Sequence, residues 1–214
     1  MNIPNKITLT RIITLLAMLI ALFVLDIVYW TNPGVLTLQT IGNSEIHPIY
    51  LGICVLFILA ALTDKLDGSL ARKWNQVTDL GKFLDPVADK LLVDGLLIYL
   101  CLPHFGYNPT NGVFLWCVIV MIIRDIVVDA LRSIAAAKGV VLAANIFGKL
   151  KTVLQMVAIP LVLLNGWPFT YFDSGWGYWR IAEIFVYLAT LASFFSGLFY
   201  LIQNRSIFAE AKHD

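Results

Sequence analysis

Two pairs of aspartates at helical spacing lie within residues 64–89, and long apolar runs flank this stretch on both sides. The pairs are Asp64 with Asp67 and Asp85 with Asp89. Charged side chains next to a bilayer are costly, and they usually mark a functional site. Carboxylates that converge in a poorly hydrated space need a counter-charge, and the hard cations Mg²⁺ and Mn²⁺ prefer oxygen ligands. The pattern therefore predicts a site for two such ions, an arrangement that suits phosphoryl transfer.

Helical spacing predicts that these carboxylates face a common gap. At 100° per residue, the first pair, Asp64 and Asp67, shares an arc of roughly 140° with Gly68, Ala71 and Arg72. The second pair lies within roughly 80° of Gly81 on the next helix. The small residues would let a nucleotide or phosphate approach the backbone, and Arg72 would meet a phosphate through its planar fork.

Pro86 leaves two alternatives for the start of this second helix. If the helix begins near Asp79, the proline lies in its interior and produces a kink. If Asp85 is the N-cap, the proline is the first helical residue, which is a favoured arrangement. The two acids of the second pair face the gap in both cases.

A second polar patch interrupts the apolar sequence farther along the chain. Arg124 and Asp125 stand in an apolar run, and helical spacing places Asp125, Asp129 and Arg132 on one face. A neighbouring helix start has polar residues on a shared face with a lysine beside it: Gly148, Lys151, Thr152 and Gln155, with Lys149. Such a cationic set predicts a site for an anionic, water-soluble co-substrate. The alternative is a basic loop that only sets membrane topology.

Composition places the chain in the membrane class. It has 214 residues, of which 59% are hydrophobic and 14% are charged, whereas soluble domains average about 25% charged residues. The net charge of +1 gives no general electrostatic reason for nucleic-acid binding. The three cysteines lack metal or redox spacing, so we interpret them as structural.

The apolar runs predict an all-α protein with six transmembrane helices, forming a single membrane domain over residues 1–214. We expect the first run to be a retained helix and not a signal peptide, because no small-residue cleavage site follows it. The expected spans are about Ile7–Trp30, His47–Arg72, Gly81–Leu102, Val113–Ala137, Ile146–Leu164 and Tyr178–Gln203.

Lysines and arginines predict the orientation of these spans. Most cluster at one end and Arg180 alone lies near the other, whereas the connections 31–46, 103–111 and 166–177 contain none. By the positive-inside rule, both termini, the acidic cluster and the second polar patch are cytoplasmic. The protein is therefore expected in the cytoplasmic membrane of the cell, as a multi-pass protein in contact with the bilayer.

The acidic stretch resembles the signature of the CDP-alcohol phosphatidyltransferases. That signature is Asp-x-x-Asp-Gly-x-x-Ala-Arg, eight residues, then Gly-x-x-x-Asp-x-x-x-Asp, and every position is filled, beginning at Asp64 and Gly81. A spacing with so many fixed positions is highly specific. The six-span architecture of the family is also similar, so the resemblance covers nearly the whole chain.

The resemblance implies roles for the acidic residues and their neighbours. Asp64, Asp67 and Asp85 would ligate the two metal ions, and Asp89 would act as a further ligand and as the general base. The residues expected to contact the CDP group are Pro4, Asn5, Thr8, Gly68, Ala71, Arg72 and Gly81.

The resemblance also implies the substrates. The opening residues 2–11 and the segments 78–92 and 148–155 are similar to family members that transfer a phosphatidyl group from CDP-diacylglycerol to glycerol-3-phosphate. Arg124, Arg132, Lys149 and Lys151 are then expected to bind glycerol-3-phosphate. A homodimer is implied as well. The alternatives are another acceptor such as inositol phosphate or serine, a polyprenyl transferase, and an ion transporter, which usually holds its acids at the bilayer midplane.

Overall fold

The computed structural model describes residues 3–32, 39–41, 44–73, 79–102, 113–140, 142, 146–173 and 180–205. Side chains are not described for 3–7, 39–41, 44, 45, 64–73, 79, 80, 82, 83, 113 and 173. The described part of the chain contains six long helices, one short helix and one β-hairpin. The predicted α-helical fold class is therefore confirmed, apart from the small hairpin.

The long helices follow the predicted apolar runs closely. Their bounds are α1 Ile3–Thr31, α2 Pro48–Lys73, α3 Asp79–Leu100, α4 Val113–Ala137, α5 Ile146–Leu163 and α7 Ile181–Gln203. At 1.5 Å per residue each one measures about 27 Å or more, close to the thickness of a bilayer core. Among the described residues, three segments are long and apolar enough to cross a membrane: Thr8–Thr31, Ile146–Leu163 and Ile181–Gln203.

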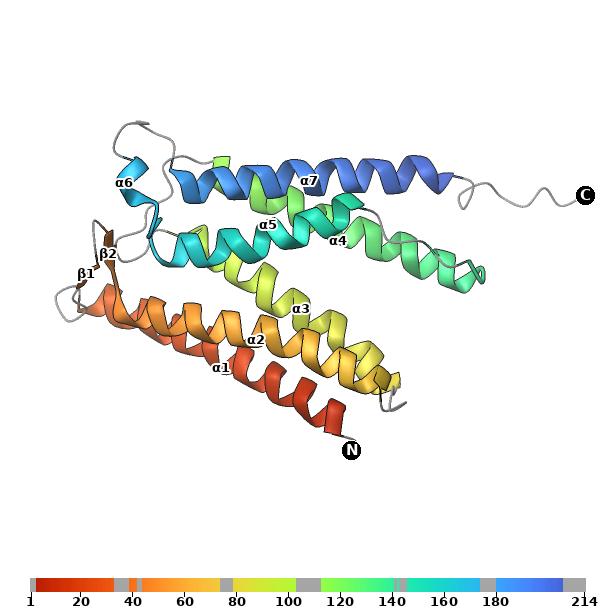
Figure 1. Cartoon of the computed structure of the whole chain (residues 1–214), viewed down its shortest axis with the longest axis horizontal. Coiled ribbons are helices and arrows are strands. Elements are labelled where there is room, and N and C mark those ends of the chain that lie inside the picture. The colour runs from red at the N-terminus through yellow and green to blue at the C-terminus, as the bar shows by residue number, and fades with distance from the viewer. Residues whose placement is uncertain are drawn as a thin grey trace, which may run out of the picture.

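Two of the predicted connections contain ordered structure that the sequence analysis did not anticipate. In the first, β1 (Gln39–Ile41) pairs antiparallel with β2 (Ser44–Ile46), so that Gln39 lies opposite Ile46. In the last, the short helix α6 covers Thr170–Asp173. Both elements lie at the end of the helix bundle opposite the start of α1 (Figure 1).

The helices form two groups that join at one end and diverge toward the other (Figure 1). Helix α1 packs against α2 and α3 in the first group, while α7 packs against α4 and α5 in the second. Helices α3 and α5 connect the groups, because α5 contacts α2 and α3 and α3 also contacts α4. The main core contains side chains from both groups, such as Leu22, Phe57, Leu96, Phe114 and Ile159.

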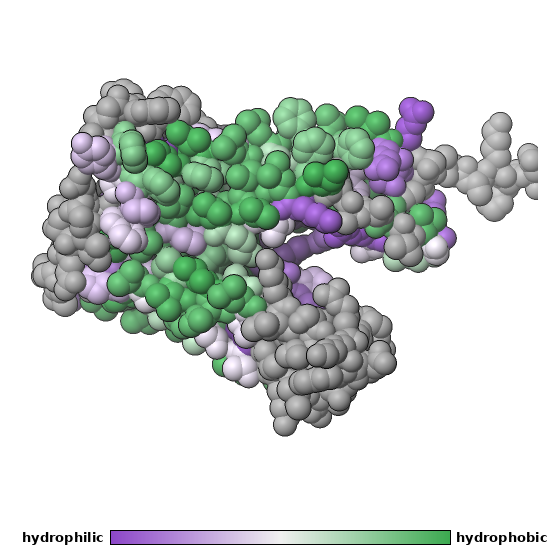
Figure 2. All heavy atoms as spheres, viewed as in Figure 1, coloured by the Kyte–Doolittle hydropathy of each residue, from purple (hydrophilic) through white to green (hydrophobic). Residues whose placement is uncertain are grey.

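The outer surface of the bundle is strongly apolar, as a lipid-facing surface must be. Ile20, Phe23 and Trp116 each have more than 60% of their area exposed. Figure 2 shows hydrophobic side chains covering the helices, and hydrophilic side chains gathered in the recess where the two groups diverge. This distribution supports the membrane class and directs attention to the recess.

Tyrosines tie the first group together at the closed end. The Tyr50 and Tyr99 hydroxyls lie 3.3 Å apart, and the Tyr99 hydroxyl donates to Asp26 Oδ1 at 3.4 Å. These contacts join α2, α3 and α1. The closed end is therefore held by buried polar contacts, while the open end carries the charged residues of the predicted site.

Pro86 lies inside α3, which begins at Asp79. Of the two alternatives for this helix, the structure therefore has the one in which the proline is internal. Asp85 is then an interior helical residue and not an N-cap.

Candidate active site

The second acidic pair lies on α3 and faces α1. Thr8 Oγ1 donates a hydrogen bond to Asp85 Oδ1 at 3.2 Å. The Arg11 Nη2 atom lies 4.0 Å from Asp85 Oδ1 and 3.9 Å from Asp89 Oδ1. The guanidinium side chain is 4% exposed, whereas the two aspartates are 48% and 57% exposed. One buried cation therefore directs two half-exposed carboxylates, one helical turn apart, to the same side of α3.

The first half of the acidic signature, residues 64–72, lies on α2. Asp64, Asp67, Gly68, Ala71 and Arg72 are all helical residues in the last turns of this helix, but their side chains lie outside the described part of the structure. The convergence of all four carboxylates therefore stays a prediction. The same holds for Pro4 and Asn5, which belong to the first turn of α1.

The structure describes the positions of two residues that are predicted to contact the CDP group, Thr8 and Gly81. Thr8 is buried and donates to Asp85, so it borders the acidic pair. Gly81 is partly buried on α3, one turn before Asp85.

Arg11 is a site residue that the sequence analysis missed. A signal was available, because Arg11 follows Thr8 by three residues and so shares its helical face.

Asp85 and Asp89 could supply half of the ligands of a hard cation. Two carboxylates at i and i+4 offer oxygen atoms on one side of a helix, which is the donor type that Mg²⁺ and Mn²⁺ prefer. No cluster of three or more His, Cys, Asp or Glu side chains occurs among the residues whose side chains are described. Asp64 and Asp67 would have to supply the other half.

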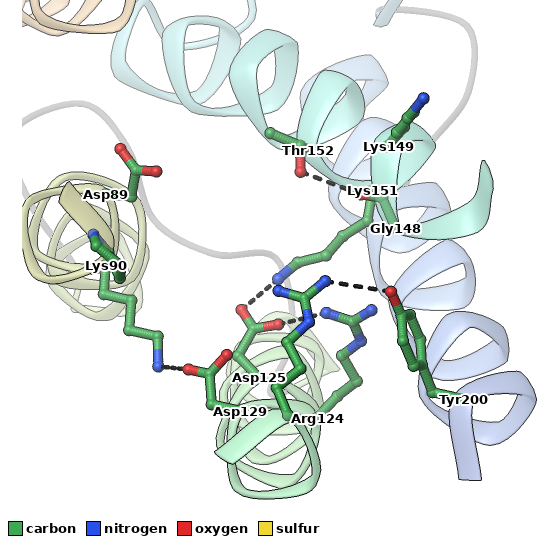
Figure 3. Close-up of a pocket in the computed structure, with 12 residues that line it drawn as sticks. Asp89, Lys90, Arg124, Asp125, Asp129, Gly148, Lys149, Lys151, Thr152 and Tyr200 are labelled. Atoms are coloured by element: carbon green, nitrogen blue, oxygen red, sulfur yellow. Dashed lines mark hydrogen bonds and ion pairs between the residues drawn. The ribbon is translucent and has the colours of Figure 1, made fainter. Parts of the chain in front are cut away.

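A polar cavity of about 350 Å³ opens between α3, α4, α5 and α7. It contains all four residues predicted to bind glycerol-3-phosphate, together with Asp89 from the acidic pair. The residues that line it are Pro86, Asp89, Lys90, Arg124, Asp125, Asp129, Arg132, Gly148, Lys149, Lys151, Thr152 and Tyr200. The sequence-predicted acceptor residues and the predicted general base therefore share one cavity (Figure 3).

A buried ion cluster forms one wall of this cavity. Arg124 Nη1 donates to Asp125 Oδ1 at 2.9 Å, and Lys151 Nζ donates to Asp125 Oδ2. The side chains of Lys151, Arg124 and Asp125 are 7%, 13% and 14% exposed. Two cations share one carboxylate here, so the cluster keeps one positive charge for an anionic ligand.

Close packing of α4, α5 and α7 fixes Arg124 in this cluster. Its Nη2 donates to Ser196 Oγ on α7. A Cβ atom at Gly197 would lie 2.8 Å from Arg124 Cγ, and one at Gly148 would lie 3.4 Å from Ser196 Oγ. A side chain at position 197 would therefore displace Arg124, whereas a Cβ at position 148 would lie 3.6 Å from Arg124 Nη2, an ordinary contact distance.

Two further cations that line the cavity, Arg132 and Lys149, are exposed. Arg132 donates to the Tyr200 hydroxyl at 3.2 Å, and its guanidinium carbon lies 5.5 Å from the centre of the Tyr200 ring. Lys149 is exposed at the start of α5. Ser196 and Tyr200 were missed by sequence analysis, because an apolar helix such as α7 gives no sign of which polar atoms face a neighbour.

The wall nearest α3 contains an ion pair that was also not anticipated. Lys90 Nζ donates to Asp129 Oδ2, joining α3 to α4, and both side chains are 44% exposed. The spacing of Asp125, Asp129 and Arg132 predicted a shared face on α4, and all three do line the cavity.

Comparison with known proteins identifies the family of the chain. The family model for CDP-alcohol phosphatidyltransferase matches residues 1–195. A Bacillus subtilis protein named CDP-diacylglycerol–glycerol-3-phosphate 3-phosphatidyltransferase is 39% identical over 203 residues, covering 95% of each chain. Proteins of the same name from Mycoplasma pneumoniae and Rickettsia typhi are 36% and 31% identical, covering 91% and 97% of this chain and 84% and 99% of their own.

This chain belongs to the CDP-alcohol phosphatidyltransferase family. The resemblance drawn from the acidic signature is thereby confirmed. The relatives carry a single enzyme name, that of the glycerol-3-phosphate-dependent members, which are the phosphatidylglycerophosphate synthases.

Proposed function

We propose that this protein is a phosphatidylglycerophosphate synthase. It transfers the phosphatidyl group of CDP-diacylglycerol to glycerol-3-phosphate and releases CMP. The observation that carries the proposal is one cavity in which Asp89 lies together with five cations, Lys90, Arg124, Arg132, Lys149 and Lys151. The lining holds three carboxylates against these five cations, which leaves two positive charges. This excess matches a phosphate monoester, whose charge at pH 7 approaches −2.

The chemistry follows from the positions of the acidic residues. Asp89 takes the proton of the acceptor hydroxyl. The hydroxyl oxygen then attacks the phosphorus that bears diacylglycerol, and the bond from this phosphorus to the CMP oxygen breaks. Arg132, Lys149 and the ion cluster around Asp125 hold the acceptor phosphate, so the attacking hydroxyl is presented to the acidic pair.

Two divalent cations, Mg²⁺ or Mn²⁺, are part of this proposal, held by Asp64, Asp67, Asp85 and Asp89. Bound ions supply electrostatic stabilisation of the charge that develops on the leaving CMP. Arg11 orients Asp85 and Asp89 for this task, since it is buried and lies within 4.0 Å of both. Pro4, Asn5, Thr8, Gly68, Ala71, Arg72 and Gly81 are proposed to contact the CDP group.

The membrane arrangement is proposed on the same grounds. All six long helices would span the bilayer in a single domain, with both termini and the acidic pair on the cytoplasmic side. The cavity then lies at the boundary between lipid and cytosol. CDP-diacylglycerol enters from the leaflet with its acyl chains in lipid, and glycerol-3-phosphate enters from water. The homodimer expected for the family would be tested by the mass of the purified protein in detergent.

The decisive experiment supplies purified protein with CDP-diacylglycerol and one acceptor at a time, and measures CMP release. Glycerol-3-phosphate is expected to support turnover that a chelator abolishes and that added Mg²⁺ or Mn²⁺ restores. Product with inositol phosphate or serine, and none with glycerol-3-phosphate, would assign a different acceptor. Turnover that persists in full with chelator present would contradict the metal proposal.

A further inference from the structure

We propose that Asp129 selects the acceptor by accepting a hydrogen bond from the C2 hydroxyl of glycerol-3-phosphate. This role rests on the transferase activity proposed above. It concerns the middle hydroxyl of the acceptor, which neither attacks phosphorus nor carries the phosphate. The role is distinct from that of the general base and from those of the phosphate-binding cations.

Asp129 differs from the other carboxylate of α4 in how it is held. Asp125 is 14% exposed and is held by two cations, Lys151 and Arg124. Asp129 lies one helical turn farther along, is 44% exposed and has one cation, Lys90, at its Oδ2 atom. Among the described residues no hydrogen-bond donor is recorded at its Oδ1 atom. Asp129 lines the cavity, so its carboxylate is within reach of a ligand.

The charges around the cavity determine which way an acceptor lies in it. Arg132 contacts Tyr200 of α7, and Lys149 and Lys151 belong to α5, so most of the cationic charge is on one side. The carboxylate of Asp89 belongs to α3, and that of Asp129 extends from α4 toward Lys90 of α3 (Figure 3). A phosphate is attracted to the first side and repelled by the second. The glycerol end of the acceptor therefore lies between α3 and α4.

This orientation places two hydroxyls against two carboxylates. The C1 hydroxyl must reach Asp89 for the reaction to proceed. The C2 hydroxyl is on the adjacent carbon. It loses its hydrogen bond to water on entering the cavity, and the carboxylate of Asp129 on the neighbouring helix can accept a hydrogen bond in its place. Lys90 follows Asp89 on α3 and extends to Asp129, as Figure 3 shows, so the ion pair joins the two helices that carry these carboxylates. It also offsets the repulsion that a lone carboxylate would exert on the phosphate.

The test compares glycerol-3-phosphate with 3-hydroxypropyl phosphate, which keeps the attacking hydroxyl and the phosphate but lacks the C2 hydroxyl. The measured quantity is the ratio of kcat/KM for the two acceptors in the full-length protein. The unmodified protein is expected to prefer glycerol-3-phosphate by about tenfold or more, as for a hydrogen bond to a charged group. Asp129→Ala is expected to reduce this preference to within about threefold of unity.

Two further variants make the result specific. Lys90→Gln breaks the same ion pair but keeps the carboxylate, so its preference is expected to stay near that of the unmodified protein. Asp129→Asn keeps the shape of the side chain and a neutral oxygen that can accept a hydrogen bond, so its preference is expected to be intermediate. This variant takes the place of Asp129→Ala in the test if the alanine variant does not fold. A loss of overall stability alone lowers both rates and leaves the ratio unchanged.

The outcomes separate this proposal from the one on which it rests. No CMP release with glycerol-3-phosphate from the unmodified protein would refute the transferase activity itself. Normal activity with the same preference in the unmodified protein and in the Asp129 variants would overturn only the role of Asp129. An equal loss of preference in Lys90→Gln would overturn it too, because the ion pair and not the carboxylate would then set the preference.

Discussion

Gly197→Ala is expected to weaken the use of glycerol-3-phosphate although residue 197 itself touches no substrate. The new methyl group would lie 2.8 Å from Arg124 Cγ, about 0.6 Å closer than the 3.4 Å at which ordinary contact begins. It would also lie 3.8 Å from Arg124 Cβ and 3.9 Å from Cδ, so it meets the stem of the arginine and not its flexible end. Relief of the contact therefore requires the whole side chain, or the helix pair α4 and α7, to move.

The magnitude follows from what Arg124 would lose by moving. Its hydrogen bonds to Asp125 and Ser196 both involve a charged donor, and such bonds contribute about 1.5–3 kcal/mol each. Overpacking costs a further ~1–3 kcal/mol of stability, against a gain of up to ~1 kcal/mol from the higher helix propensity of alanine. If Arg124 moves away, glycerol-3-phosphate loses a hydrogen bond to its guanidinium group. The loss of one such bond is expected to lower kcat/KM for glycerol-3-phosphate by about tenfold or more.

The assay measures kcat and KM for each substrate separately. The KM for glycerol-3-phosphate is expected to rise about tenfold, while the KM for CDP-diacylglycerol changes by less than about twofold. Gly52→Ala is the matched control, because Gly52 is also a helical glycine and a Cβ there would meet nothing within 4 Å. An unchanged KM for glycerol-3-phosphate in Gly197→Ala would refute the reasoning that this glycine seats Arg124.

The remaining predictions concern the base, the lysines, the closed end and the metal. Asp89→Asn should lower kcat by about 10²-fold or more while CDP-diacylglycerol still binds, as measured by single-turnover kinetics and lipid binding. Lys149→Ala and Lys151→Ala should both raise the KM for glycerol-3-phosphate. The effect of Lys151→Ala should be larger and accompanied by lower thermal stability, because it removes a partner from the buried Asp125. Tyr99→Phe should cost about 1–3 kcal/mol of unfolding free energy with unchanged KM values, since its hydroxyl contacts lie at the closed end. A chelator should abolish CMP release without unfolding the helices, as followed by circular dichroism.

The helices were predictable because bilayer spans are long apolar segments with polar interruptions. The predicted span Val113–Ala137 has the bounds of α4, and the predicted end of the last span, Gln203, is the end of α7. The hairpin β1–β2 was missed because strands of three residues carry too little periodicity to stand out. The pair Gly42-Asn43 between them is typical of two-residue hairpin turns, so a signal for it was present.

The site was predictable where its residues share one helix, and unpredictable where it depends on contacts between helices. Spacing alone grouped Asp125 with Arg132 on α4, and both line the cavity. It could not show that Arg11 of α1 would reach the acidic pair of α3, or that Tyr200 of α7 would contact Arg132. Such contacts depend on how α1 rotates against α3 and α7 against α4, and hydropathy does not fix that rotation.

Helix α3 links the two halves of the proposed reaction through two consecutive residues. Asp89 faces Arg11 of α1, beside the proposed nucleotide site, whereas Lys90 contacts Asp129 of α4 in the acceptor cavity. Successive residues project about 100° apart on a helix, so Asp89 can contact α1 while Lys90 contacts α4, although both line the cavity. A rigid element between the two helix groups can therefore fix the base relative to both substrates. The charged residues of α3 are costly near a membrane, and the proposed reaction gives them a role, because it brings together two substrates from different phases.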